Sequence, residues 1–158
     1  MAIFMAWISL AADAMASLSF LGFIVAITLQ IIYRYLGVSI IFSEELARLL
    51  NIYAVFLGAV VATRYDFHIR IDVIDKLFLR YRALATGFRI FYQAVGLLFY
   101  VILGIGSFIM VKENWELPLA TMSWLNSGHV YLAPAIASVL MFVLTLGKIV
   151  ELLKGVDR

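Results

Sequence analysis

Long uncharged stretches constrain this 158-residue chain more than any other feature. A helix that crosses a bilayer needs about 20 consecutive residues that are mostly apolar. Hydrophobic residues make up 65% of the chain and charged residues 14%, whereas soluble domains average about 45–50% and about 25%. A soluble protein of this size could not bury so much apolar surface, so we expect a single integral membrane domain. Four stretches lack Asp, Glu, Lys and Arg: residues 14–33, 49–63, 90–111 and 117–147.

These stretches predict four membrane helices. The first and third have the required length. The second is about one turn short, so its helix must begin before Arg48, and the fourth is interrupted between Pro118 and Gly128. A membrane β-barrel would instead show alternating strands of about ten residues. The sequence therefore predicts an all-α fold, an integral membrane four-helix bundle with helices over about residues 14–35, 43–64, 88–111 and 129–152.

Lys and Arg divide unequally between the two sides of this bundle. Nine lie on the side that holds both termini and the 64–89 connection, and three lie on the other side. Because Lys and Arg concentrate in the cytoplasm, we expect both termini to be cytoplasmic. The first twelve residues are apolar but lack the basic start of a secretory signal, so we expect an uncleaved lead-in to the first helix.

The 64–89 connection carries the periodicity of an amphipathic helix. Its apolar residues recur at helical spacing, and its charged residues lie largely off that face. This pattern predicts a helix over about residues 72–82. It either lies in the membrane interface near anionic headgroups or packs on the cytoplasmic end of the bundle, and the pattern favours neither. The apolar face consists of Val73, Ile74, Leu77, Phe78 and Tyr81.

The composition argues against several classes of function. A net charge of +2 is too small to suggest nucleic-acid binding, and the absence of Cys excludes disulfides, thiolate metal sites and thiol nucleophiles. His68 and His129 fall on opposite sides of the membrane, so they cannot bind one metal, and bonding to backbone or lipid explains them better. We expect no catalytic residues and no metal or cofactor in this chain.

The charges also argue against independent transport. A membrane transporter usually keeps an ionisable residue within the membrane. In this chain the middles of all four apolar stretches lack one, and every Asp and Glu lies near a helix end.

Small and polar residues recur at helical spacing on the first two helices. Such stripes let membrane helices approach closely, and amides can bond across the contact. Packing inside the bundle explains them more simply than contact with another protein. The stripes are Gly22, Ala26, Gln30 and Arg34 on the first helix, and Ala47, Asn51, Ala54, Gly58 and Ala62 on the second.

Both stripes run toward a charged cluster at the non-cytoplasmic end. Ser43 is a suitable N-cap for the second helix, and Glu44 and Glu45 in its first turn would complement the helix dipole. Arg48 follows Glu44 by four residues and Glu45 by three, so we expect a local ion pair with one of them. A charge at this depth is costly to desolvate, so its other expected partner is a second chain.

A set of short motifs resembles a known family. The most specific part runs from Ser-Glu-Glu-x-x-Arg at residues 43–48 to His-x-x-x-Asp at residues 68–72. Around it stand Arg34-Tyr35, Phe42, Phe56-Leu57-Gly58-Ala59, Arg64, Leu117-Pro118, Tyr131 and Pro134. Over about residues 15–150 the chain resembles the small membrane subunit, of the DctQ type, of tripartite ATP-independent periplasmic (TRAP) transporters. It departs from the family at Phe42, where Trp is usual, and in lacking the charged N-terminal start.

The resemblance implies partners and a role. Small subunits of this family pair with a large membrane subunit that holds the substrate and sodium sites and moves as an elevator. A periplasmic binding protein delivers the substrate, typically an organic acid such as a C4-dicarboxylate or sialic acid. The implied role is that of a scaffold in the bacterial inner membrane. We expect the interface with the large subunit or with phospholipid to include Arg34, Glu44, Glu45, Arg48, Asn51, Gly58, Arg64, His68 and Asp72.

Two other functions stay open at this point. One is a self-assembling carrier or channel, which would need no large partner. The other is a membrane-anchor subunit of a redox complex that holds haem, which a visible absorption spectrum would reveal.

Overall fold

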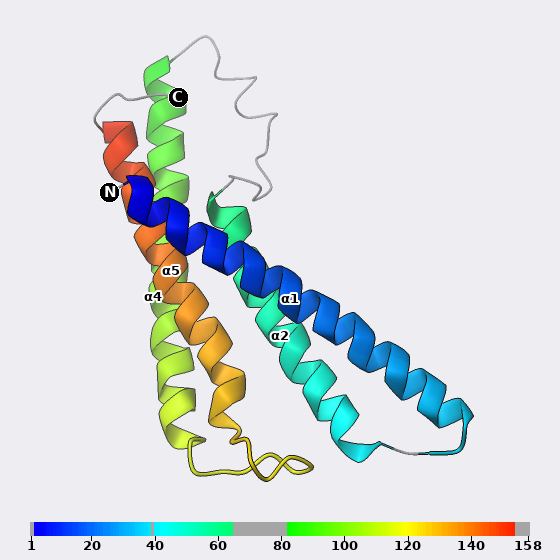
Figure 1. Ribbon diagram of the computed structural model, residues 1–158. Coiled ribbons are helices and arrows are strands. Elements are labelled where there is room, and N and C mark those ends of the chain that lie inside the picture. Colours follow the sequence, from blue (N-terminus) through cyan, green and yellow to red (C-terminus); the bar gives the residue numbers. More distant parts are fainter. Residues whose placement is uncertain (1, 39, 65–81, 154–158) are drawn as a thin grey trace.

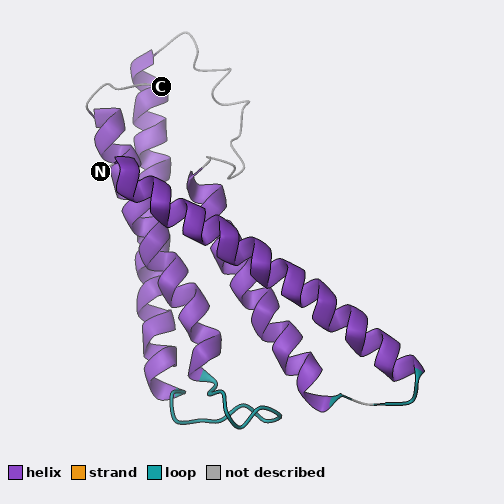
Figure 2. Ribbon diagram, viewed as in Figure 1, coloured by secondary structure: helices purple, strands orange, loops and turns teal. Residues whose placement is uncertain are grey.

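The computed structural model describes residues 2–38, 40–64 and 82–153, and the described residues form four helices and their connections (Figure 2). The all-α fold expected from the sequence is confirmed. The helix expected over residues 72–82 lies outside the described residues, except for Arg82. The helices are α1 (Ala2–Tyr35), α2 (Ile41–Arg64), α4 (Arg82–Glu113) and α5 (Gly128–Leu153).

Each helix contains a segment that is long and apolar enough to cross a membrane. These segments are Leu10–Tyr35, Ile41–Arg64, Ile90–Glu113 and Gly128–Val150. The chain is therefore a multi-pass membrane protein. With 34 residues, α1 is about 50 Å long, which exceeds the roughly 30 Å of a hydrocarbon core. It must tilt or extend beyond the core, and Figure 1 shows it crossing the other helices obliquely.

The helices form two antiparallel hairpins that meet through α2 and α5. α1 packs against α2, α4 packs against α5, and α2 joins the two pairs. The order across the protein is therefore α1, α2, α5, α4 (Figure 1). The start of α1 and the end of α5 lie at one end of the molecule, while the α1–α2 turn and the α4–α5 loop lie at the other.

The turn after α1 is closed by Gly37. The Gly37 N–H donates to the Arg34 carbonyl at 3.2 Å, and the Val38 N–H donates to the Tyr33 carbonyl at 2.9 Å. These two bonds and the left-handed backbone of Gly37, with φ of 75°, make a Schellman motif. A residue with a Cβ would be strained at that φ, so Gly37 fixes where α1 ends and α2 can begin.

The start of α2 differs from the prediction. The helix begins at Ile41, so Ser43 lies inside its first turn. The Ser43 hydroxyl donates to the Ile40 carbonyl at 2.7 Å, whereas an N-cap side chain would accept from a backbone N–H two or three residues ahead. The predicted N-cap role of Ser43 is therefore wrong, because the apolar pair Ile41-Phe42 already adopts the helical conformation.

The α4–α5 loop, residues 114–127, folds back on itself as a short hairpin. Pro118 and Asn126 pair as an antiparallel bridge. The Leu119 N–H donates to the Leu125 carbonyl at 2.9 Å. Met122 is 1% exposed, so the loop contains a fully buried side chain. The loop thus has a defined backbone that other elements can bind.

The core is small and lies where three helices meet. Ala12 of α1, Val60 of α2 and the α5 residues Ala137, Met141 and Leu144 form one buried cluster. Large apolar side chains of α1 and α4 remain exposed along most of their lengths. Because a soluble protein rarely exposes apolar patches of that size, these outer faces require lipid or another membrane protein.

Candidate subunit interface

The predicted charged cluster lies beside the α1–α2 turn. An Nη atom of Arg48 lies 3.7 Å from an Oε atom of Glu44, and both side chains are 71% exposed. The predicted local pair of Arg48 is therefore confirmed, with Glu44 as the partner. Arg34 occupies the last turn of α1 and is also exposed. Because the pair is exposed, it contributes only about 0.3–0.5 kcal/mol to helix stability.

Glu45 has a different role from its neighbour Glu44. Its carboxylate accepts a hydrogen bond from the Ala120 N–H at 3.1 Å and one from the Thr121 N–H at 2.8 Å. The Thr121 hydroxyl donates to the same carboxylate. These three donors all belong to the α4–α5 loop, so Glu45 ties the start of α2 to the second hairpin.

A second contact joins the hairpins at the start of α5, where His129 also has contacts within its own hairpin. The Tyr53 hydroxyl donates to the His129 carbonyl at 3.0 Å. The His129 ring stacks on Trp115, with 5.2 Å between ring centroids. Nδ1 of His129 lies 3.2 Å from the Asn126 nitrogen. His129 therefore bonds to backbone, as expected from the sequence, and it has a structural place at the start of α5.

The opposite end of the molecule has its own polar contacts. Asp13 Oδ2 lies 4.0 Å from Arg64 Nη1, with both side chains about one-third exposed. Lys148 Nζ donates to the Thr63 carbonyl at 2.5 Å. A cation at the C-terminal end of a helix satisfies its last carbonyls and favours its dipole. Arg64 and Lys148 therefore join α1, α2 and α5 at this end.

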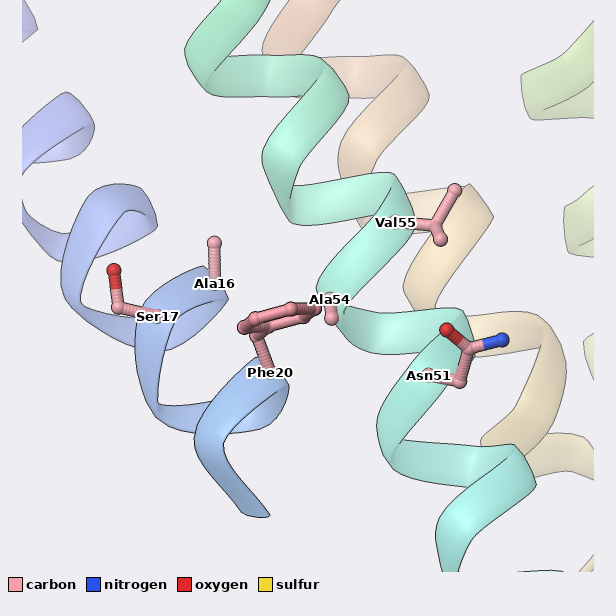
Figure 3. Close-up of a pocket in the computed structure, with 6 residues that line it drawn as sticks. All are labelled: Ala16, Ser17, Phe20, Asn51, Ala54 and Val55. Carbon is pink, nitrogen blue, oxygen red and sulfur yellow. The ribbon is translucent and has the colours of Figure 1, made fainter. Parts of the chain in front are cut away.

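Asn51 lies on the open side of the α1–α2 hairpin. It lines a groove of about 320 Å³ together with Ala16, Ser17, Phe20, Ala54 and Val55. Figure 3 shows Phe20 reaching from α1 toward Ala54, while Asn51 projects from α2 beyond Ala54. The side chain of Asn51 is exposed. We call this surface the Asn51 groove.

Gly58 lies two turns after Asn51, and the space where a side chain would begin is open. A Cβ added at Gly58 would meet nothing within 4 Å. By contrast, a Cβ at Gly104 of α4 would lie 3.0 Å from the Ser138 hydroxyl of α5. Gly104 therefore lies at a close contact between α4 and α5, whereas the space beside Gly58 on α2 is open.

Two of the expected interface residues, His68 and Asp72, lie outside the described residues. Across residues 2–38, 40–64 and 82–153, no group of three or more His, Asp or Glu side chains could hold a metal ion. The described parts of the candidate interface are thus apolar faces, an exposed ion pair and the Asn51 groove.

Sequence reasoning missed two contacts between distant parts of the chain. Glu45 and Thr121 are 76 residues apart, and no spacing rule connects them. Asp13 marked only the boundary of an uncharged stretch, yet it pairs with Arg64. The available signal was that a carboxylate bordering an apolar span should have a partner.

The comparison with protein families gives one finding. The model of the family "Tripartite ATP-independent periplasmic transporters, DctQ component" matches residues 23–155. This region begins within α1 and continues beyond the end of α5, so it covers all of α2 and α4. A comparison with curated proteins gave no match.

Proposed function

Because the chain belongs to the DctQ family of TRAP transporter components, we propose that it is the scaffold subunit of a sodium-coupled organic-acid transporter. Its partners would be a large membrane subunit and a periplasmic substrate-binding protein. The substrate would be an organic acid such as a C4-dicarboxylate or sialic acid, and the large subunit would bind both substrate and sodium. The family match over residues 23–155 is the observation that carries this proposal.

The apolar outer faces support a scaffold role. On α4, Leu98, Ile102 and Ile105 are 62%, 63% and 58% exposed. On α1, Leu18 and Leu21 are 72% and 60% exposed. Exposed apolar helices of this length enlarge the area over which a transporter contacts lipid, which would resist movement of the complex in the bilayer.

The polar contacts support a rigid role. Glu45 holds the α4–α5 loop, Lys148 holds the end of α2, and Arg64 lies beside Asp13. Each uses a charged side chain to tie one helix of this chain to another element of it. These charged side chains stabilise the fold of this chain. Such a use suits a component that anchors a moving partner and performs no catalysis.

The excess of Lys and Arg on one side supports an orientation with both termini in the cytoplasm of a bacterial inner membrane. The α1–α2 turn and the α4–α5 loop would then face the periplasm. In that orientation the exposed Glu44–Arg48 pair would lie at the periplasmic headgroup level.

The test is co-purification in mild detergent from cells of the source organism. An affinity-tagged chain should bring down one large multi-pass membrane protein in a constant ratio. The control is a tagged membrane protein of similar size from the same cells. Recovery of this chain alone, or with haem absorbance in the visible spectrum, would overturn the scaffold proposal.

A further inference from the structure

The α4–α5 loop has an unusual composition for a connection between two membrane helices. Its only charged residue is Glu116, and residues 117–127 continue directly into the uncharged stretch that ends at residue 147. A membrane helix needs only about 20 apolar residues, and α5 begins at Gly128. The span itself therefore does not explain why the residues before Gly128 lack charge, whereas connections in water are usually polar.

Hydrogen bonds to α2 hold the middle of this loop at the end of a membrane span. Glu45 lies four residues after Ile41, the first residue of the α2 span, which is a rise of about 6 Å along the helix. Its carboxylate accepts from the Ala120 N–H at 3.1 Å and from the Thr121 N–H at 2.8 Å. The loop is thus tied beside the first turns of α2 and cannot extend far from the membrane.

The two ends of the loop lie at span ends as well. The α4 span ends at Glu113, and the α5 span begins at Gly128. The Ser127 N–H donates to the Leu117 carbonyl at 2.7 Å, which closes the base of the hairpin. Figure 1 shows the loop lying across this end of the molecule, beside the start of α2. Its base and its middle are therefore both held at the depth where the spans end.

Large side chains stay exposed on this loop. Trp124 is 75% exposed, Leu117 is 54% exposed and Trp115 is 45% exposed. Trp124 follows Thr121 by three residues, so it lies close to the tether formed by Glu45. Trp is enriched at the membrane–water interface, because its ring is apolar and its N–H can bond to headgroups or water. In water these side chains would leave a large apolar area exposed.

The neighbouring α1–α2 turn has the same character. Tyr35 at the end of α1 is 89% exposed, and Phe42 at the start of α2 is 52% exposed. The exposed Glu44–Arg48 pair follows directly. Aromatic side chains next to exposed charges mark the interfacial layer of a membrane protein. Both connections at this end therefore lie in the same layer.

We infer that the α4–α5 loop is a membrane anchor that inserts Trp124 and Leu117 into the headgroup region of the leaflet at this end of the molecule. Its partner is the phospholipid surface. The loop thereby fixes the depth of α4 and α5 and, through Glu45, the depth of α2. The inference requires only that the chain spans a membrane, so it does not depend on the proposed function. A soluble protein docked on the loop is the competing occupant.

The experiment follows the fluorescence of Trp124 in the full chain. The sequence has three Trp residues, so Trp7→Phe combined with Trp115→Phe leaves Trp124 as the only reporter. This chain is reconstituted in phosphatidylcholine liposomes, with or without phosphatidylcholine brominated near the headgroup end of its acyl chains. The brominated lipid should reduce the emission about twofold, and iodide in the buffer should quench it much less than it quenches free tryptophan.

The matched control moves the reporter to the middle of a span. It carries Ile102→Trp, with the three natural Trp residues replaced by Phe. Ile102 lies twelve residues after Ile90 and eleven before Glu113, which bound the α4 span. Lipid brominated near the ends of its acyl chains should quench this control more strongly than lipid brominated near the headgroup. Trp124 should show the reverse order.

Three outcomes would overturn the anchor. If iodide quenches Trp124 like free tryptophan and brominated lipid leaves it unchanged, the loop lies in water. If neither quencher reaches Trp124, protein covers it. If Trp124 becomes shielded only when a purified periplasmic binding protein is added, the loop is a docking site for that protein. None of these results decides the scaffold role, which co-purification tests separately.

A second measurement keeps all three Trp residues. The sequence has no Cys, so Leu117→Cys provides a single site for a nitroxide label, and Ile102→Cys provides the mid-span control. Circular dichroism like that of the parent would show that each labelled chain keeps its helices. In liposomes, a water-soluble nickel complex should collide with the label at 117 about threefold less often than with free label, and least often with the label at 102. Collision at 117 as frequent as with free label would overturn the inference.

Discussion

Two neighbouring glutamates of this protein have different tasks. Glu44 forms an exposed pair with Arg48 one turn away. Glu45 accepts hydrogen bonds from the Ala120 and Thr121 N–H groups of a distant loop. Hydrogen bonds from several donors to one carboxylate are stronger than a single exposed ion pair at 3.7 Å. Glu45 therefore contributes to the tertiary fold, whereas Glu44 contributes to its own helix.

Glu45→Ala should loosen the α4–α5 loop. With the carboxylate gone, the amides of Ala120 and Thr121 lose their acceptor and should exchange hydrogen faster, on the order of tenfold. Hydrogen-exchange mass spectrometry of the loop peptide in detergent would measure this change. Glu44→Ala is the matched control, because it removes an adjacent carboxylate that does not bind the loop. Equal exchange in both variants would show that Glu45 does not hold the loop.

Helical spacing predicted the ion pair of Arg48 in the charged cluster but not the contacts of Glu45. Spacing along one helix predicted the partner of Arg48, because residues four apart lie on the same face. The same rule also allowed Glu45 as the partner of Arg48. It could not detect that Glu45 binds a loop 75 residues away in the sequence. Tertiary contacts decided between the two glutamates.

At the scale of the helices, charge spacing predicted the four segments that are apolar enough to cross a membrane better than it predicted where the helices end. The first helix was expected from about residue 14 because Asp13 ends the uncharged stretch, yet α1 begins at Ala2. The helix continues through Asp13, whose carboxylate lies 4.0 Å from Arg64. Likewise α4 begins at Arg82, since charged residues near an interface do not end a helix. An uncharged stretch thus indicates where a span lies, but it does not set where the helix begins or ends.

Gly128 gives a prediction for the junction of α4 and α5. A Cβ at this position would lie 2.9 Å from Trp115 Cε3, 3.1 Å from Trp115 Cα and 3.2 Å from the Val111 carbonyl oxygen. Two of these atoms belong to the backbone and cannot move easily. Gly128→Ala should therefore destabilise the protein by about 1–3 kcal/mol, the usual cost of overpacking.

Thermal unfolding in mild detergent would measure the effect of Gly128→Ala as a lower Tm. Gly106→Ala in α4 is the matched control, because a Cβ there meets nothing within 4 Å and Ala favours a helix over Gly. The control should keep the parent Tm or raise it slightly. A Gly128→Ala chain as stable as the control would mean that α4 and α5 approach less closely at this point.

At the scale of the whole molecule, the helices that form the core differ from those that face lipid or other proteins. The central helices α2 and α5 provide most of the buried residues, and the outer helices α1 and α4 face outward (Figure 1). Sequence patterns predicted four spans and their all-α class, because hydropathy alone sets them. They could not predict the order α1, α2, α5, α4, since every apolar face can pack against either a helix or lipid.

The chain alone should not accumulate an organic acid. Coupled transport needs a binding site near the bilayer midplane and a part that moves around it. In this sequence the Asp, Glu, Lys and Arg residues lie toward the ends of the apolar spans, and Asn51 lies close to one of those ends. Reconstituted in liposomes with a sodium gradient, the chain should take up C4-dicarboxylate or sialic acid no faster than empty liposomes. Adding the large subunit and the binding protein should give sodium-dependent uptake. Sodium-driven accumulation by this chain without them would replace the scaffold with an autonomous carrier.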